Sequence, residues 1–155
     1  EARASAIAGA LERLSGVYQG DEPTRRARLA ELDDAVDPAA LLHFSPAQYA
    51  ARAQWNADPR RFERVPEPFD PDAAILWSPA WSLTRGRPRS LPTAFCWYDA
   101  PRGDGPAFCV ADSNGCAAGA TLVEAIVQGA LELCERDAVA IWWYNRLRRP
   151  GVDLD

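Results

Sequence analysis

The residues whose chemistry stands out form an acidic series between Glu124 and Glu135, with spacings of three and four residues. If this stretch is helical, its members fall within an arc of about 80° around the helix axis: Glu124, Gln128, Glu132 and Glu135. Carboxylates on one buried face repel one another and lose hydration, so that each unpaired ion costs several kcal/mol. A divalent cation would relieve that repulsion, because hard ions such as Mg²⁺ take carboxylate oxygens together with water and nucleotide phosphates.

The same stripe has structural explanations that the sequence leaves open. Glu124 can serve only as a capping residue, because Thr121 and Glu124 have the spacing of a capping box at the start of a helix. Glu135 can pair with an arginine, and the whole stripe can face solvent. These alternatives compete with the cation site.

The element that must carry the stripe is a helix that follows a glycine-rich turn, Gly115 to Gly119. Most other positions from Leu122 to Cys134 are apolar, so the sequence predicts a largely buried helix with one narrow acidic face. The helical pattern continues from 138 to 148, where three aromatic residues are expected in the core, with a base-stacking platform as the alternative: Trp142, Trp143 and Tyr144.

A second helix is predicted at the start of the chain, from Glu1 to Leu14, because alanine and leucine dominate and Gly16 follows as a stop signal. Three of its residues lie on one face within an arc of about 60°: Ser5, Gly9 and Glu12.

The middle of the chain predicts a sheet. The apolar segments 73–83 and 91–98 read as two strands joined by the basic turn 85–90, and 107–111 reads as a short third strand. The segment 24–36 has an amphipathic helical pattern, and 46–53 predicts a short helix. The expected fold is α/β (α+β): a mixed, mainly antiparallel sheet packed against the N-terminal helix and the helix after Thr121.

Composition narrows the class of protein. The 155 residues, 48% of them hydrophobic, are enough for one globular domain with a core. The net charge of −5 is a mixture of both signs without a concentrated basic patch, which argues against nucleic-acid binding. No apolar run approaches membrane length and no signal peptide is evident, so a cytoplasmic location is expected. The four cysteines lack CxxC pairing, which favours reduced structural thiols over zinc.

At this point the chain resembles a known family. The run from Ser113 to Gly119, followed by a helix with Glu, Gln, Glu and Glu-Arg-Asp at these spacings, looks like the YcaO family. The N-terminal helix resembles the family's other nucleotide helix at Ala4-Ser5-Ala6 and Glu12-Arg13. Gly9 departs from that pattern, because it stands where the family has a glutamate that binds metal. The tryptophan-containing strands before the turn also resemble the family.

The resemblance implies a set of site residues. ATP and Mg²⁺ would be the cofactors, with the metal held by Glu12, Glu132 and Glu135. The nucleotide would be positioned by five further residues: Ser5, Asn114, Glu124, Gln128 and Arg136. No catalytic group is assigned.

The resemblance also implies a function. Family members activate backbone amides of peptides, most often for cyclodehydration of Cys, Ser or Thr to azolines, and thioamide or amidine formation stays open. The alternative is a non-catalytic YcaO-like subunit that binds a peptide or a partner protein. A peptide substrate is expected, while a leader-peptide-binding partner protein and a homodimer are left open. The chain, which begins at Glu1 without methionine, reads as one partial domain lacking its N- and C-terminal parts and inactive alone.

Overall fold

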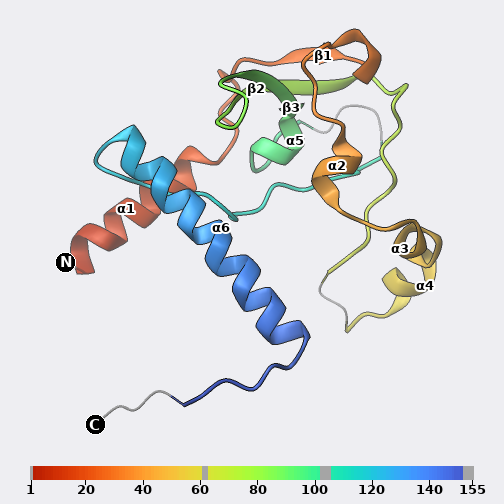
Figure 1. The fold of residues 1–155 in the computed structure, drawn as a ribbon. Helices are drawn as coiled ribbons and strands as arrows, with labels where there is room; N and C mark the ends of the chain where they lie inside the picture. Colours follow the sequence, from red (N-terminus) through yellow and green to blue (C-terminus); the bar gives the residue numbers. More distant parts are fainter. Residues whose placement is uncertain (1, 61–62, 102–105, 152–155) are drawn as a thin grey trace. The chain divides into compact units, whose positions relative to one another are not determined.

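The computed structural model describes residues 2–60, 63–101 and 106–151 (Figure 1). The chain forms two compact units, each described here on its own. The sheet unit comprises residues 17–112, and the helix unit comprises residues 1–16 and 113–155. The expectation of one partial domain over 1–155 stays a prediction.

A three-stranded antiparallel sheet organises the sheet unit. Its strands are β1 (Arg25–Ala27), β2 (Ile75–Ser82) and β3 (Arg87–Pro92), in the order β1-β2-β3. The mainly antiparallel sheet of the predicted fold class is thus confirmed, whereas its packing against the two helices stays a prediction.

The boundaries of the hairpin differ from the prediction. The turn is short and ends at Gly86, whose φ of 59° is in the left-handed region and whose N–H donates to the Ser82 carbonyl at 2.8 Å. Most of the segment expected to be a basic turn is therefore strand β3. After Pro92 the chain forms the short helix α5 (Thr93–Cys96), so the predicted strand over 91–98 is wrong beyond its first residues. Residues 107–111 are not a strand either.

The third strand comes from a segment that was expected to be helical. Residues 24–36 contain β1 and the 3₁₀ helix η1 (Leu29–Glu31), and Ala35 forms an isolated bridge with Ser90. The Arg89 Nε donates to the Asp34 carbonyl, and the Val36 N–H donates to the Ser90 carbonyl at 2.9 Å. These long-range hydrogen bonds override the local helical pattern, which sequence periodicity does not reveal.

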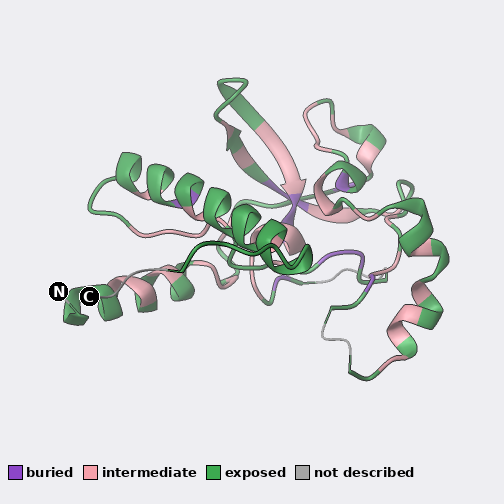
Figure 2. Cartoon of the chain, turned by 60° about the horizontal axis from the view of Figure 1, so that its bottom comes forward, coloured by how far each residue is buried: buried purple, intermediate pink, exposed green. Residues whose placement is uncertain are grey.

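The core of this unit centres on Trp77 in β2, which is 1% exposed. Its indole N–H donates to the Ala27 carbonyl at 2.9 Å, so burial leaves no polar group unsatisfied there. Beside it the hydroxyls of Ser78 and Thr93, both buried, share a hydrogen bond of 3.0 Å. Figure 2 shows buried positions on the strands and also in loops of this unit, among them Val65 and Phe108.

Three short helices follow β1. They are α2 (Pro38–Leu42), α3 (Pro46–Ala50) and α4 (Arg52–Ala57), of which α2 and α3 begin after the capping residues Asp37 and Ser45. The short helix predicted over 46–53 is therefore two helices. The proline-rich connection that follows includes residues 61–62, which lie outside the described residues.

Two helices form most of the helix unit: α1 (Ala2–Ser15) and α6 (Leu122–Tyr144). Both match predicted helices, although Glu1 lies outside the described residues and α6 ends before the predicted continuation to Arg148. The helix ends at Tyr144, and Arg146, two residues later, has a left-handed φ of 52° that turns the chain away from the helical path. No helix in the described chain is both long and apolar enough to span a membrane.

The predicted burial of α6 is wrong in this structure. Gly129 is its one buried residue among those described, and the aromatic residues expected in the core are exposed, including Trp143 at 67% (Figure 2). Apolar periodicity shows which faces of a helix favour burial, but burial itself requires further elements to pack there. Here the tight contacts of α6 are made on the face of Gly129, by the loop before the helix.

Candidate functional site

The start of α6 is fixed by the capping box that the sequence predicts. The Thr121 hydroxyl accepts from the Glu124 N–H at 3.2 Å, and the Glu124 carboxylate accepts from the N–H groups of Thr121 and Ala120. Such a reciprocal cap satisfies N–H groups that have no partner inside the helix. Glu124 is therefore a capping residue in this structure.

The glycine-rich segment before the helix begins with a tight turn, Ser113 to Cys116. The Cys116 N–H donates to the Ser113 carbonyl at 3.0 Å, and Gly115 has a φ of 82°. A residue with positive φ at the third position is what a type II turn requires, and glycine adopts it without steric cost.

From this turn the loop runs back along α6. A Cβ on Gly129 would lie 2.5 Å from the carbonyl oxygen of Gly115, and one on Gly119 would lie 2.5 Å from the Ala125 nitrogen. Both glycines therefore permit an approach of backbone to backbone that a side chain would prevent. The loop and the first half of α6 form one tightly packed piece.

Glu132 joins the turn to the helix. One of its carboxylate oxygens accepts from the Gly115 N–H, and the other accepts from the Arg136 Nε at 3.1 Å. The Glu132 side chain is 21% exposed, and that of Arg136 is 59% exposed. The alternative in which an arginine pairs with Glu135 is not seen in the described part of the chain, where Arg136 pairs instead with Glu132, one helical turn before it.

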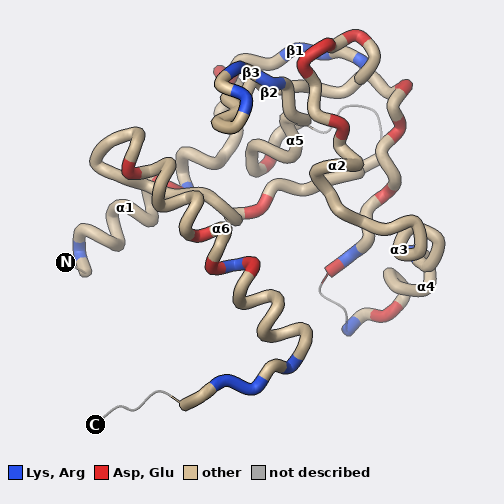
Figure 3. Tube along the Cα trace, viewed as in Figure 1, with Lys and Arg blue, Asp and Glu red and all other residues tan. Residues whose placement is uncertain are grey.

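A pocket of about 410 Å³ lies in the helix unit. Its walls come from α1, from the end of the Ser113–Cys116 turn with the loop that follows it, and from α6: Glu12, Cys116, Ala117, Ala118, Gln128, Leu131, Glu132 and Glu135. We call it the acidic pocket. Because the charged positions of α6 end at Asp137, the acidic pocket lies along the charged part of the helix, before an uncharged stretch to Tyr144 (Figure 3).

The structure brings four of the predicted site residues together and leaves four apart. Glu12, Gln128, Glu132 and Glu135 line the acidic pocket. The others do not line it, although Arg136 reaches Glu132: Ser5, Asn114, Glu124 and Arg136. The roles assigned to all eight stay predictions.

The donor set of the acidic pocket suits a hard cation. Three carboxylates and one amide supply oxygen ligands, which Mg²⁺ prefers. In the described part of the chain, however, no three His, Cys, Asp or Glu side chains are close enough to form a metal site as they stand. The residues therefore fit Mg²⁺ by chemistry, and side-chain movement is required to gather them.

Sequence reasoning missed part of the wall. Cys116, Ala117, Ala118 and Leu131 line the acidic pocket beside the charged residues. Cys116 ends the Ser113–Cys116 turn and the two alanines follow it, and the small side chains of all three were the available signal. Leu131 gave none, because its place in the helical pattern is that of a core residue.

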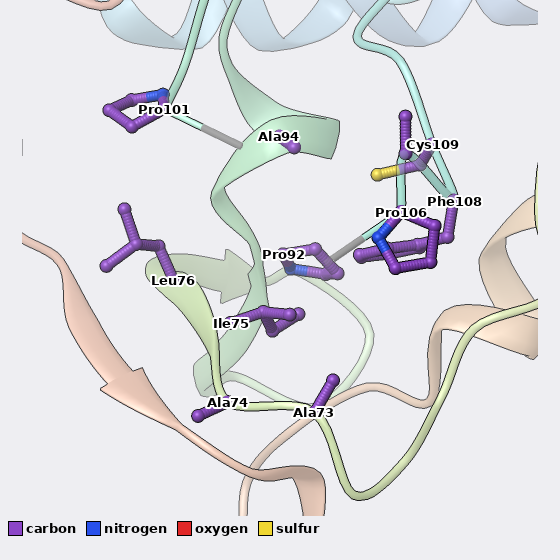
Figure 4. A pocket seen from close by; sticks show the side chains of 11 residues that line it. Ala73, Ala74, Ile75, Leu76, Pro92, Ala94, Pro101, Pro106, Phe108 and Cys109 are labelled. Atoms are coloured by element: carbon purple, nitrogen blue, oxygen red, sulfur yellow. The ribbon is translucent and has the colours of Figure 1, made fainter. Parts of the chain in front are cut away.

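A different pocket in the sheet unit has no such chemistry. Its lining is apolar apart from the thiol of Cys109, and it includes Ile75 and Leu76 of β2, Pro92 of β3, and Phe108 (Figure 4). Its volume is about 50 Å³, which is small for a ligand. The carboxylates that the sequence assigns to a metal are in the helix unit.

Comparison with known proteins identifies the family. The whole chain, residues 1–155, matches the family model described as YcaO cyclodehydratase, ATP- and Mg²⁺-binding. A solved structure of a heterocyclase in complex with substrate and cofactor is 53% identical over 97% of this chain, with a TM-score of 0.89. The heterocyclase TruD is 51% identical over 99% of the chain, with a TM-score of 0.86.

A more distant solved structure shares this fold, and a sequence relative also matches. The structure of YcaO from Methanopyrus kandleri, bound with AMPPCP and Mg²⁺, is 24% identical over 99% of the chain, with a TM-score of 0.59. An uncharacterized protein from Methanothermobacter thermautotrophicus is 28% identical over 157 residues, which covers all of this chain and 34% of that protein. This chain spans only 20% and 22% of the two heterocyclases. The match over its full length confirms the predicted family: the chain belongs to the YcaO family.

Proposed function

We propose that the full-length protein containing this chain binds ATP and Mg²⁺ at the acidic pocket and uses them to activate backbone amides of a peptide. The observation that carries the proposal is the meeting of Glu12 from α1 with Gln128, Glu132 and Glu135 from α6 around one pocket. The two helices come from opposite ends of the chain, so the pocket depends on the fold and not on one sequence motif.

The size and charge of the acidic pocket support this use. Its volume of about 410 Å³ is within the range of small-molecule sites. Carboxylates alone would repel phosphates, so a nucleotide requires a cation between them. Glu12, Glu132 and Glu135 are the residues that would hold Mg²⁺, which would supply the positive charge that phosphates need.

The residues of this chain would mainly position the nucleotide and neutralise the charge of its phosphates. Gln128 can donate or accept a hydrogen bond at the pocket wall. Arg136 uses one of its five N–H donors on Glu132, and the remaining four can meet a phosphate. The Ser113–Cys116 turn offers the exposed Asn114 beside the loop that lines the pocket, and Ser5 and Glu124 are assigned to the nucleotide by family resemblance alone.

The favoured reaction is cyclodehydration. A Cys, Ser or Thr side chain of the substrate would add to the preceding carbonyl carbon, and the resulting oxyanion would take the terminal phosphoryl group of ATP and release ADP. An azoline forms as phosphate leaves, so one peptide and one ATP give the azoline, ADP and phosphate. Positioning and charge neutralisation are the protein's main contributions to such a reaction.

One observation favours the alternative of a non-catalytic subunit. Gly9 lies on the face of α1 that carries Glu12 and supplies no carboxylate there. A pocket with one carboxylate fewer binds a cation more weakly, and a subunit that only binds a peptide or a partner protein would tolerate that loss. A cytoplasmic location, a leader-peptide-binding partner and a homodimer remain part of the proposal in either case.

Mass spectrometry of a peptide substrate separates these functions. The full-length protein is incubated with ATP, Mg²⁺ and a cysteine-containing peptide, and with a matched peptide in which alanine replaces cysteine. Cyclodehydration predicts the loss of one water from the first peptide only, together with one ADP for each product. Peptide binding without ATP turnover or a mass change would support the non-catalytic subunit and overturn the enzymatic proposal.

A further inference from the structure

The carboxylate of Glu132 differs from the other carboxylates of the acidic pocket in what it contacts. One oxygen accepts from the backbone N–H of Gly115, 17 residues earlier in the chain, and the other accepts from Arg136 one helical turn later. Within the part of the chain that the structure describes, no hydrogen bond or ion pair engages the carboxylates of Glu12 and Glu135. Of these three carboxylates, Glu132 is therefore the one that contacts other groups of the described chain.

Gly115 is held at two points. Its N–H donates to the Glu132 carboxylate, and its carbonyl lies against the backbone of α6. The Gly115 carbonyl packs against Gly129, with no space for a Cβ between them, and the Gly115 Cα faces the side chain of Leu133. A hydrogen bond from a backbone N–H to a carboxylate is stronger than one to a neutral acceptor. At a side-chain exposure of 21%, this bond is partly shielded from competing water.

The same side chain also fixes Arg136. A bond at Nε limits the rotation of the guanidinium and leaves the planar pair of terminal amino groups for another anion. Arg136 and Glu132 are four residues apart in one helix, and such ion pairs stabilise a helix only weakly when both side chains are exposed. Here the pair is stronger because the Glu132 side chain is partly buried. Glu132 therefore links three parts of the helix unit: the turn, the acidic pocket and Arg136.

We propose that Glu132, in addition to its proposed role toward Mg²⁺, positions the Ser113–Cys116 turn and Arg136 beside the acidic pocket. The effect of this positioning on ATP binding rests on the proposed function, because the turn and Arg136 are the groups that would contact the nucleotide. Its physical basis, the bond from Glu132 to the turn, is independent of any nucleotide. Loss of the bond loosens the loop that forms the pocket wall at Cys116, Ala117 and Ala118.

Hydrogen–deuterium exchange in the full-length protein, without nucleotide or metal, tests the bond directly. We expect the segment 113–118 to exchange about tenfold faster in Glu132→Ala than in the unmodified protein. Glu132→Gln keeps an acceptor for the Gly115 N–H and should recover most of the protection. Glu135→Ala is the matched control, because Glu135 lines the same pocket without contacting the turn, and its exchange in 113–118 should stay unchanged.

Unchanged exchange of 113–118 in Glu132→Ala, or equal acceleration in Glu135→Ala, would overturn the inference. If Glu132→Ala does not fold, the comparison rests on Glu132→Gln against Glu135→Gln, of which only the first should accelerate exchange, by a few-fold. A failure of the unmodified protein to bind ATP would remove the proposed function and leave this exchange result in place. The two proposals can therefore fail separately.

Discussion

Replacing Gly129 with alanine would test the tight packing of the turn against α6. The new Cβ would lie 2.5 Å from the Gly115 carbonyl oxygen, a backbone atom held by the turn, so that loop or helix must move by about 1 Å. Overpacking of this kind costs about 1–3 kcal/mol, whereas alanine in place of glycine inside a helix gains about 1 kcal/mol. The expected net effect is a loss of stability by up to about 2 kcal/mol.

Gly9 in α1 provides a matched control, since it is also inside a helix and a Cβ there would meet nothing within 4 Å. Gly9→Ala should gain the same helical propensity without the clash and should stabilise the protein by about 0.5–1 kcal/mol. Denaturant unfolding of both full-length variants isolates the clash as their difference, expected at about 1–3 kcal/mol. Equal stability of the two variants would refute the close approach of Gly115 to Gly129.

Three further predictions follow from the local structure. Thr121→Ala removes the capping hydroxyl of α6 and should lower the free energy of unfolding by about 1 kcal/mol in denaturant titration, whereas Thr121→Ser should lower it little; an equal loss in both variants would contradict the capping role. Burial raises the pKa of the Cys96 thiol to about 11, so its alkylation rate, followed by mass spectrometry, should still be rising with pH at pH 10; a plateau near pH 9 would contradict this burial. Gly9→Glu adds a carboxylate on the face of Glu12, where a Cβ would meet no atom within 4 Å, and should tighten Mg²⁺-dependent ATP binding about tenfold in calorimetry, whereas uncharged Gly9→Gln should not; equal affinities would exclude a metal role for this position.

The helices and the capping box were predictable because their signals are local. The predominance of alanine and leucine indicated α1, and Thr121 with Glu124 marks the start of α6. The spacing of Gln128, Glu132 and Glu135 predicted that they share one face, and all three line the acidic pocket. These features depend on residues within one or two helical turns of one another.

The features that were missed depend on contacts between distant residues. The strand β1 exists because Arg25 to Ala27 pair with Trp77 to Ile75, some 50 residues away, and no local pattern encodes that pairing. Similarly, the approach of Gly115 to Gly129 makes Glu132 a partner of the turn, a role invisible in the helical spacing. The burial of α6 was overestimated because an apolar pattern does not indicate whether other elements pack against that helix.

Calorimetry of ATP binding to the full-length protein, with and without Mg²⁺, tests the central proposal most directly. Glu135→Gln removes one charge from the acidic pocket, and Asp137→Asn removes one from an exposed position on the same helix that does not line it. We predict that ATP binding requires Mg²⁺, weakens about tenfold or more in Glu135→Gln and is unchanged in Asp137→Asn. Equal ATP affinity of the unmodified protein and Glu135→Gln, or no ATP binding at all, would contradict a nucleotide and metal site at the acidic pocket.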